Sequence, residues 1–446
     1  MDLEDVDLLR KYLDSFPEFK KRLKCCPPSV YWRGRWRAVT GLRKRFSGLE
    51  LRCKGAGTMQ LTPRAMVSVQ RDEQKGRLLT LIRTFLGPVR TTELLDKTDR
   101  NRHQTEAILR ARLRVGETTI VVMAIYENES TDLLSRLLSA LVLWWDRLRE
   151  AERIAVFLPE RWSERLVELL PYLTVPVVCY KYRMETSQIR QIYPRSGHSS
   201  KVQSPYVMYP LATDAPKLLA DLKAEHPSLD LLFRHGKWEL SYKGLPVTWV
   251  SEDCVFFDLA EPKRFTGRSS LLSHIQQVIR LRRFPPPDAD HFCFRFGEER
   301  WLESLFLRDY RKINPAFTNQ IYSQVPTWVG GDRKVLDLLT VTRNGRLAVL
   351  ELKTQKNLSL LFQGLDYWER VEHHRMRSDF VRSGYFTGMN LIKSLPLLYL
   401  ISPLFEFHRV LLVLRRYLRK EVRVRCVGTN SDWKRELKIL RQFELQ

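Results

Sequence analysis

The sequence predicts an α/β protein, because strand-like and helix-like patterns alternate along most of the chain. Short apolar runs typical of buried strands are separated by longer segments with helical periodicity. From residue 298 to residue 427 the expected order is helix, three strands, helix, strand, helix, strand, and a further strand is expected at 437–443. The chain before it mixes hairpin signals with helices, which predicts preceding α+β domains, and basic residues are frequent there.

Length and breaks in composition divide the 446 residues into four regions. A chain of this length exceeds one average domain. Three consecutive prolines at 285–287 end a helical segment and mark the last boundary. The expected regions are a basic, aromatic N-terminal region, a small α/β domain, a mixed α+β region and a C-terminal α/β domain, at residues 1–75, 76–185, 186–290 and 291–446.

Turn signals and a helix cap define the elements of the two middle regions. Gly116-Glu117 and Lys243-Gly244 separate pairs of apolar runs and predict hairpins. Asp132 is a helix cap. The expected strands are 107–115, 118–126, 154–158, 175–182, 238–242 and 245–250, and the expected helices are 132–149, 161–170, 218–225 and 269–283.

In the C-terminal region the apolar runs have the length of strands. Those at 336–341 and 347–352 are nearly continuous, which is typical of strands that are covered on both faces. The expected strands are 321–329, 336–341, 347–352, 396–402, 422–427 and 437–443, and the expected helices are 298–308, 358–372 and 404–418.

Two of these strands each carry one acidic residue, and the turn between them decides whether the acids meet. A two-residue turn would place Asp337 and Glu351 on opposite faces of the sheet. A three-residue loop pairs Thr342 with Arg346, with Gly345 in the left-handed conformation. In that register Asp337 lies directly opposite Glu351. We predict the three-residue loop, because this register alone builds a site.

Lys353 lies on the same face as Glu351, by the period of two in a strand. Two carboxylates and an ammonium are costly in an apolar sheet unless they are paired or hold a metal ion. Hard oxygen ligands beside an ammonium suit Mg²⁺ or Mn²⁺ and a phosphate. We expect Asp337 and Glu351 to be metal ligands and Lys353 to be catalytic. The alternative is an exposed hairpin with a surface ion pair, which the apolar strands disfavour.

The helix after the second acidic strand presents three polar residues on one face, Gln363, Tyr367 and Arg370. Gln363 and Tyr367 are expected to orient the lysine, a water or a phosphate, and Arg370 to contact nucleic acid. The alternative is that Tyr367 packs in the core while Gln363 satisfies nearby polar groups.

Asp337, the tripeptide Glu351-Leu352-Lys353 and the segment from Gln363 to Tyr367 together resemble the PD-(D/E)XK nuclease superfamily, whose RecB-type branch carries a QxxxY motif. The resemblance covers about residues 295 to 445, and Leu336 stands where the name-giving proline would be. It implies a restriction-endonuclease-like αβββαβ core and metal-dependent hydrolysis of phosphodiester bonds.

The resemblance also implies a third metal ligand on the helix before the first strand. Glu299 and Glu303 lie one turn apart there. Glu303 is the first choice and Glu299 the second, and a surface pair near Arg308 is the alternative. In region 76–185 the order of elements echoes the same core without its acids. That region is therefore either a degenerate nuclease-like domain or an unrelated small α/β domain.

The charge of the chain predicts a polyanionic partner. Seventy-five Lys and Arg residues against 51 Asp and Glu give a net charge of +24, and nucleic acid is the commonest partner for such a protein. An organism with arginine-rich proteins would also produce this balance. Cations among Tyr31, Trp32 and Trp36 suit phosphate contacts and base stacking, although a solvated hairpin fits them equally. These cations are Arg33, Arg35, Arg37, Arg43, Lys44 and Arg45.

These observations lead to the expectation of a cytoplasmic, Mg²⁺-dependent nuclease that acts on DNA. Scattered cysteines without a CxxC pair indicate a reducing compartment, and no apolar run reaches the roughly 18 residues of a membrane span. The alternatives are a catalytically silent nucleic-acid-binding protein and a subunit of a repair or defence complex. A homodimer or a protein partner is left open.

Overall fold

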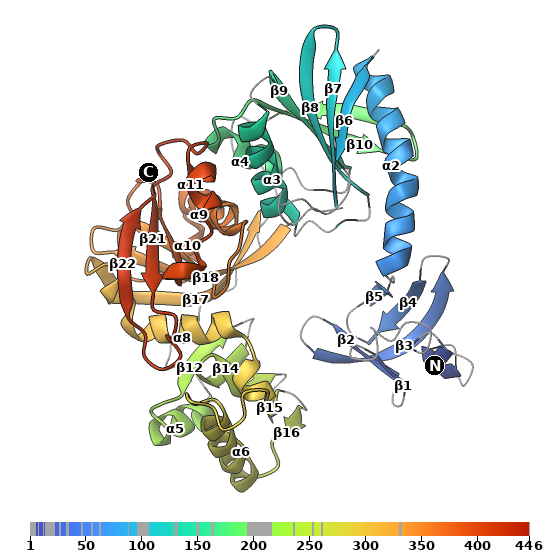
Figure 1. Ribbon diagram of the computed structural model, residues 1–446. Coiled ribbons are helices and arrows are strands. Elements are labelled where there is room, and N and C mark those ends of the chain that lie inside the picture. The colour runs from blue at the N-terminus through green and yellow to red at the C-terminus, as the bar shows by residue number, and fades with distance from the viewer. Residues whose placement is uncertain are drawn as a thin grey trace. The chain divides into compact units, whose positions relative to one another are not determined.

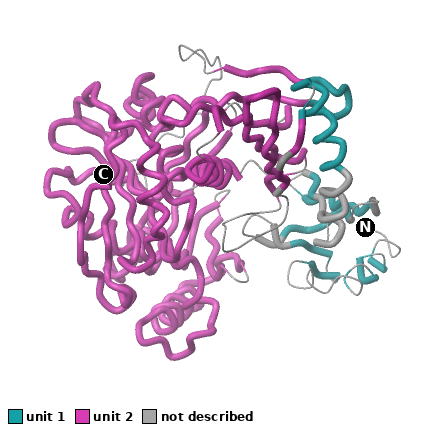
Figure 2. Tube along the Cα trace, turned by 45° about the horizontal axis from the view of Figure 1, so that its top comes forward, with its two compact units in different colours: residues 1–89, 183–188 teal, residues 90–182, 189–446 magenta. Residues whose placement is uncertain are grey.

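The structure is a computed structural model that describes residues 23–95, 107–193 and 216–445, together with part of the segment 6–13. Within these ranges it leaves out residues 26–27, 33–34, 46–47, 55–56, 62–63, 88, 128, 130–132, 149–150, 161, 163–164, 235–236, 252–253, 260–261 and 330–331. The chain divides into two compact units, residues 1–89 with 183–188 and residues 90–182 with 189–446 (Figure 2). Helices and strands are both abundant, so the expected α/β class is confirmed.

The first unit contains a five-stranded sheet whose strands follow one another in space as in the chain. All pairs of adjacent strands in this sheet are antiparallel. The strands are β1 (Leu23–Cys25), β2 (Pro28–Trp32), β3 (Arg35–Arg45), β4 (Gly48–Cys53) and β5 (Gly57–Leu61). A long helix that the sequence patterns did not predict, α2 (Arg64–Leu86), follows the sheet.

The second unit begins with a six-stranded sheet in the order β6-β7-β8-β9-β10-β11. The first three strands are antiparallel neighbours, and β8, β9 and β10 are parallel. Its elements are β6 (Arg90–Leu95), β7 (Ile108–Val115), β8 (Thr118–Ile125), α3 (Leu134–Arg147), β9 (Arg153–Pro159), α4 (Arg165–Leu169), η3 (Leu170–Tyr172), β10 (Val177–Arg183) and β11 (Gln188–Ile192).

A second sheet of this unit is an antiparallel meander of five strands. Two helices pack on it through a small apolar core that includes Leu219 and Ile275. Its elements are α5 (Lys217–Glu225), β12 (Asp230–Arg234), β13 (Lys237–Tyr242), β14 (Leu245–Ser251), β15 (Cys254–Phe257), β16 (Lys263–Arg264) and α6 (Arg268–Leu281).

The C-terminal sheet again has six strands in chain order, β17-β18-β19-β20-β21-β22. Three antiparallel strands come first, two parallel neighbours follow, and β22 is antiparallel to β21. The elements are α7 (Phe292–Arg295), α8 (Glu298–Asp309), η5 (Tyr310–Lys312), β17 (Phe317–Val329), β18 (Asp332–Thr342), β19 (Leu347–Leu352), α9 (Leu360–Met376), α10 (Asp379–Arg382), β20 (Leu397–Pro403), η6 (Leu404–Glu406), α11 (Val410–Arg415), β21 (Val424–Thr429) and β22 (Ile439–Glu444).

Two helices cover the two faces of the C-terminal sheet, which explains why its strands are apolar on both sides. Leu350 and Leu352 of β19 pack in one core with Trp301 and Phe306 of α8. The alternate residues of β19 join a second core that includes α9. Gly364 lets α9 approach β20 closely, because a Cβ there would lie 2.8 Å from the Leu400 side chain. Figure 1 shows α8 and α9 among the elements around this sheet.

The hairpin between β18 and β19 has the register that the sequence predicted. Val341 pairs with Leu347 and Leu338 pairs with Leu350. The Thr342 amide donates to the Arg346 carbonyl at 2.9 Å, and Gly345 has φ +83°. Continuing the register by one pair places Asp337 opposite Glu351.

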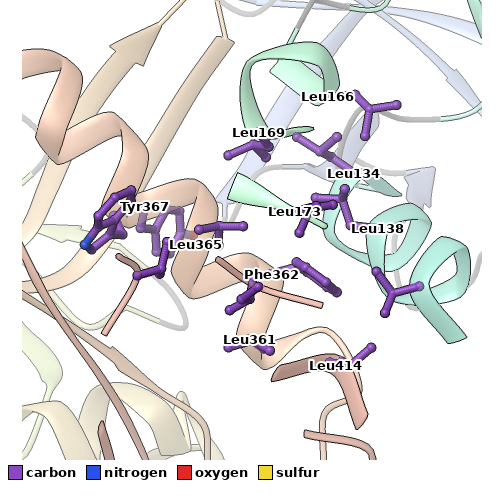
Figure 3. Packing of buried hydrophobic residues seen from close by; sticks show 14 of the residues in the cluster. Leu134, Leu138, Leu166, Leu169, Leu173, Leu361, Phe362, Leu365, Tyr367 and Leu414 are labelled. Carbon is purple, nitrogen blue, oxygen red and sulfur yellow. The ribbon is translucent and has the colours of Figure 1, made fainter. Parts of the chain in front are cut away.

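The first and last sheets of the second unit share one hydrophobic core through their helices. Leu134 and Leu138 of α3 lie opposite Phe362 and Leu365 of α9 (Figure 3). Regions 76–185 and 291–446 therefore pack against each other, and the interface between them buries apolar side chains from both.

Most predicted elements are present, with one notable difference near the C-terminus. The helix expected over 404–418 is divided into η6 and a short α11. His408 interrupts it, since its Nδ1 accepts a hydrogen bond from the Val410 amide at 3.1 Å and begins a new turn. In the part of the chain that the structure describes, no helix combines the length and apolar character needed to cross a membrane.

Candidate active site

The two acids project from adjacent strands onto the face that α9 covers. Glu351 is 0% exposed, whereas Asp337 is half-buried. The Asp337 Oδ2 accepts a hydrogen bond from the Leu352 amide at 2.9 Å, which ties the acid to the neighbouring strand. The backbone of the sheet thus positions the Asp337 carboxylate directly.

Lys353 completes the group at the end of β19. Its amide donates to the Ile401 carbonyl at 2.9 Å, so the backbone of this residue is held by β20. Its Nζ lies 3.3 Å from Glu351 Oε1 and 3.1 Å from Glu299 Oε2. Burial alone would lower the pKa of Lys353, but Glu351, Asp337 and Glu299 together raise it above its usual value. The ammonium therefore stays charged.

The surroundings of the two acids disfavour their charged forms. Burial raises the pKa of Glu351 well above its usual value, and the Asp337 charge raises it further. Burial also raises the pKa of Asp337, against the lowering effects of Lys353 and the Leu352 amide. Neither oxygen of Glu351 accepts a hydrogen bond of normal geometry from the described residues. A bound cation would favour the charged forms.

The donor set fits a hard divalent cation that keeps several water ligands. The described residues contain no group of three or more His, Cys, Asp or Glu side chains arranged to hold a metal ion. Mg²⁺ is commonly bound by only one or two carboxylates, with water and substrate phosphate as the other ligands. A site with the two carboxylates of Asp337 and Glu351 would match this pattern.

Gln363 and Tyr367 lie together on α9, as expected. The Gln363 side-chain amide donates to the Tyr367 hydroxyl at 3.3 Å. Burial raises the pKa of Tyr367, and the charges of Glu351 and Asp337 raise it further. The phenol therefore stays protonated beside the acids and is able to donate a hydrogen bond.

Glu303, the first choice for a third ligand, is enclosed by protein hydrogen bonds. Its Oε1 accepts from Arg234 Nη2 at 3.0 Å, and its Oε2 accepts from Gln324 Nε2 at 2.8 Å. Burial raises the pKa of Glu303 to about 7, although Arg234 lowers it. The second choice, Glu299, reaches Lys353 instead. Helix α8 therefore contributes Glu299 to the ion-pair cluster and holds Glu303 in a buried network behind it.

Arg370 was expected to contact nucleic acid, and the structure does not support this expectation. The side chain is fully buried. Its guanidinium donates to the Asp332 carboxylate at 2.5 Å and to Asp366 at 3.1 Å. Its donors are thus turned into the protein, where they join the start of β18 to α9, and a phosphate in solvent cannot reach them.

The basic residues of the N-terminal region belong to the first unit. Arg43 is exposed and Arg37 is half-buried on β3. The other expected phosphate contacts fall partly or wholly outside the described residues: the side chains of Arg35, Lys44 and Arg45, and the whole of Arg33. Their expected contacts with nucleic acid stay predictions.

An open depression lies at the Lys353 and Glu299 side of the cluster. Its volume is about 580 Å³, and its walls are the start of α8 and the loop after β19. Glu299 and Lys353 both line it, together with Gln355 and Asn357. The polar lining and the open shape suit a hydrated, charged ligand better than an apolar one.

A buried ionic network behind α9 was not predicted. Arg165 of α4 donates to Asp366 at 2.6 Å and lies 2.5 Å from Glu369, both on α9. The arginine in the mostly apolar sequence of α4 could have indicated a buried ion pair. Its partners on α9 could not be identified from the sequence, because they depend on how regions 76–185 and 291–446 pack. Arg234 and Glu303 illustrate the same limit.

Comparison of the chain with models of known protein families, with curated proteins and with solved structures finds no match.

Proposed function

We propose that the protein is a metal-dependent nuclease of the PD-(D/E)XK type that hydrolyses the phosphodiester bonds of DNA. The observation that carries the proposal is the convergence of Asp337, Glu351 and Lys353 in the hairpin register that brings the acids together. The order of helices and strands around them and the net charge of +24 support the same assignment.

Asp337 and Glu351 would hold Mg²⁺ or Mn²⁺, which supplies electrostatic stabilisation and a more acidic bound water. Lys353 presents a charged donor to the phosphate oxygen that gains negative charge during the reaction. Tyr367 offers a second donor, and the Gln363 amide orients its hydroxyl. The depression beside α8 would admit the phosphodiester to Lys353, which lines it.

The test is a cleavage assay with Mg²⁺ or Mn²⁺ on single-stranded and double-stranded DNA and on RNA. Lys353→Ala is expected to reduce the cleavage rate by at least about 10²-fold, because it removes the charged donor. Lys263→Ala is the matched control. It also removes one lysine that is ion-paired, to Asp258 at 3.2 Å, but it does so on the meander sheet. Its rate should equal that of the wild type.

Equal rates for Lys353→Ala and the wild type would contradict the proposed role of the site. Salt-sensitive binding of nucleic acid without cleavage of any substrate would reject the nuclease. It would favour the catalytically silent binding protein instead.

A further inference from the structure

The first and last sheets of the second unit repeat one topology. In each, three consecutive antiparallel strands are followed by two parallel neighbours and an edge strand, in chain order. In each, a helix follows the third strand and another helix precedes the fifth, namely α3 and α4 in the first sheet and α9 and α11 in the last, where the short α10 is an addition between α9 and β20. We call these two parts the first half, residues 90–182 with 189–193, and the last half, residues 298–445.

Residue pairing aligns the two halves without reference to sequence similarity. The hairpin of the first half is closed by Val115 and Thr118, and that of the last half by Thr342 and Arg346. Counting five residues back and forward from each closing pair matches Arg110 to Asp337 and Met123 to Glu351. The first parallel pairs, Ile120 with Arg153 and Ala348 with Leu397, yield the same match for the second position.

The first half therefore lacks the chemistry of the last. Arg110 faces Met123 across its hairpin, where Asp337 faces Glu351. Ile125 stands at the position of Lys353 by the same count. The sequence of β8, TTIVVMAI, has no acidic residue, and both Met123 and Ile125 are fully buried in the shared core.

The halves pack on each other as a two-fold axis requires. Helix α3 contacts its counterpart α9, and the cross pairs are reciprocal, α4 with α9 and α11 with α3. In such an interface each patch meets the equivalent patch of its partner.

The strongest sign of the axis is a contact between equivalent segments. Leu173, which follows α4 and η3, forms an antiparallel bridge with Leu418, which follows α11. The Thr174 amide donates to the Tyr417 carbonyl at 2.9 Å, and the Arg419 amide donates to the Tyr172 carbonyl at 2.9 Å. These two hydrogen bonds are related by exchange of the halves, so the pseudo-two-fold axis passes between Leu173 and Leu418.

We propose that the chain is an internal pseudo-dimer with a single working site, and that it cuts one strand of a duplex per encounter. This inference rests on the proposed function. The strands of a duplex are related by two-fold axes, so a two-fold protein with two sites presents one to each strand. Here one of the two positions carries Arg110 and Met123. The helices through which a second chain would pair are already covered by the first half.

The step consumes one water for each strand cut. The water oxygen forms a bond to phosphorus, and one phosphorus–oxygen ester bond breaks. The departing sugar oxygen takes one proton, and the other proton is released or stays on the new phosphate monoester. The second strand is intact after this step, so the product from a closed circle is a nicked circle.

The test uses supercoiled plasmid with Mg²⁺ and excess full-length protein, beside a single-stranded circle. Nicked circle should accumulate first, with linear DNA appearing only later, and the rate should rise with the first power of protein concentration. Linear DNA formed from the earliest times without a nicked intermediate would overturn the inference but keep the nuclease. Cleavage confined to the single-stranded circle would do the same. No cleavage of any substrate would overturn both.

A matched pair of substitutions tests which half is catalytic. Met123→Leu conserves core volume, and the nicking rate should stay within about two-fold of the wild type, because Met123 has no chemical role in this assignment. Glu351→Gln at the equivalent position should lower the rate by at least about 10²-fold. A comparable loss in both variants, with both folded by circular dichroism, would show that the first half is not inert.

Discussion

Glu351 is a fully buried carboxylate that lies beside Asp337, and among the described residues its nearest cation is Lys353 at 3.3 Å, so burial and the Asp337 charge still oppose its charged form. A cation that binds the folded state should therefore stabilise the protein. Mn²⁺ at 100 times its Kd should add about 2.7 kcal/mol to the free energy of unfolding, and Glu351→Gln should abolish that increment. Thermal unfolding with and without Mn²⁺ measures it independently of cleavage.

Glu372→Gln is the control for this residue-scale prediction. Glu372 is also a buried carboxylate, but it pairs with Arg375 at 2.6 Å at the far end of α9. This variant is expected to lower the unfolding midpoint while keeping the full Mn²⁺-induced shift. A shift retained by Glu351→Gln would show that Mn²⁺ binds elsewhere.

At the scale of one element, the conformation of the hairpin between β18 and β19, which aligns Asp337 and Glu351, depends on Gly345. Its φ is +83°, and an added Cβ would lie 1.9 Å from the Asn390 carbonyl oxygen. Gly345→Ala should therefore destabilise the protein by more than about 2 kcal/mol, since backbone strain and a steric clash add together. Denaturant unfolding measures the loss.

Gly116 offers the matched control, because it occupies the corresponding hairpin of the first half. Its φ is +59°, but nothing lies within 4 Å of an added Cβ. Gly116→Ala should cost only the strain of about 1–2 kcal/mol. Equal losses in the two variants would mean that the loop of residues 390–392 moves aside and does not constrain the hairpin.

For the molecule as a whole, the shared core of the second unit predicts that its two halves unfold together. Arg165 of α4 pairs with Asp366 and Glu369 of α9 inside this interface. Arg165→Met leaves the buried Glu369 without its cation and Asp366 with Arg370 alone, which should cost about 3–5 kcal/mol. Hydrogen exchange should show β9 and β20 losing protection to the same extent.

Arg416→Met is the control variant for Arg165→Met. Arg416 also bridges the halves, to Asp146 at 3.1 Å, but its side chain is 57% exposed. Such an exposed pair should cost at most about 1 kcal/mol. Loss of protection in β9 alone after Arg165→Met would indicate that the halves unfold independently.

Features of the site that depend on residues close together in the chain were predictable, and contacts between residues far apart in the chain were not. The facing of Asp337 and Glu351 was predictable because turn chemistry at Gly345 sets the register over a few residues. The enclosure of Glu303 by protein hydrogen bonds was not predictable, because Arg234 reaches it from β12. Arg370 was misassigned for the same reason, since its partner Asp332 lies 38 residues away in the chain.

The sequence by itself therefore determined the α/β class, most of the strands and helices, and the local cluster of Asp337, Glu351 and Lys353. Periodicity and turn residues are local properties, and they were sufficient for these features. The tertiary structure decided which glutamate of α8 reaches the lysine, which arginines are buried, and how the first half, which lacks the paired acids, packs on the last. Those outcomes depend on contacts between segments far apart in the chain, whose geometry no short stretch of residues encodes.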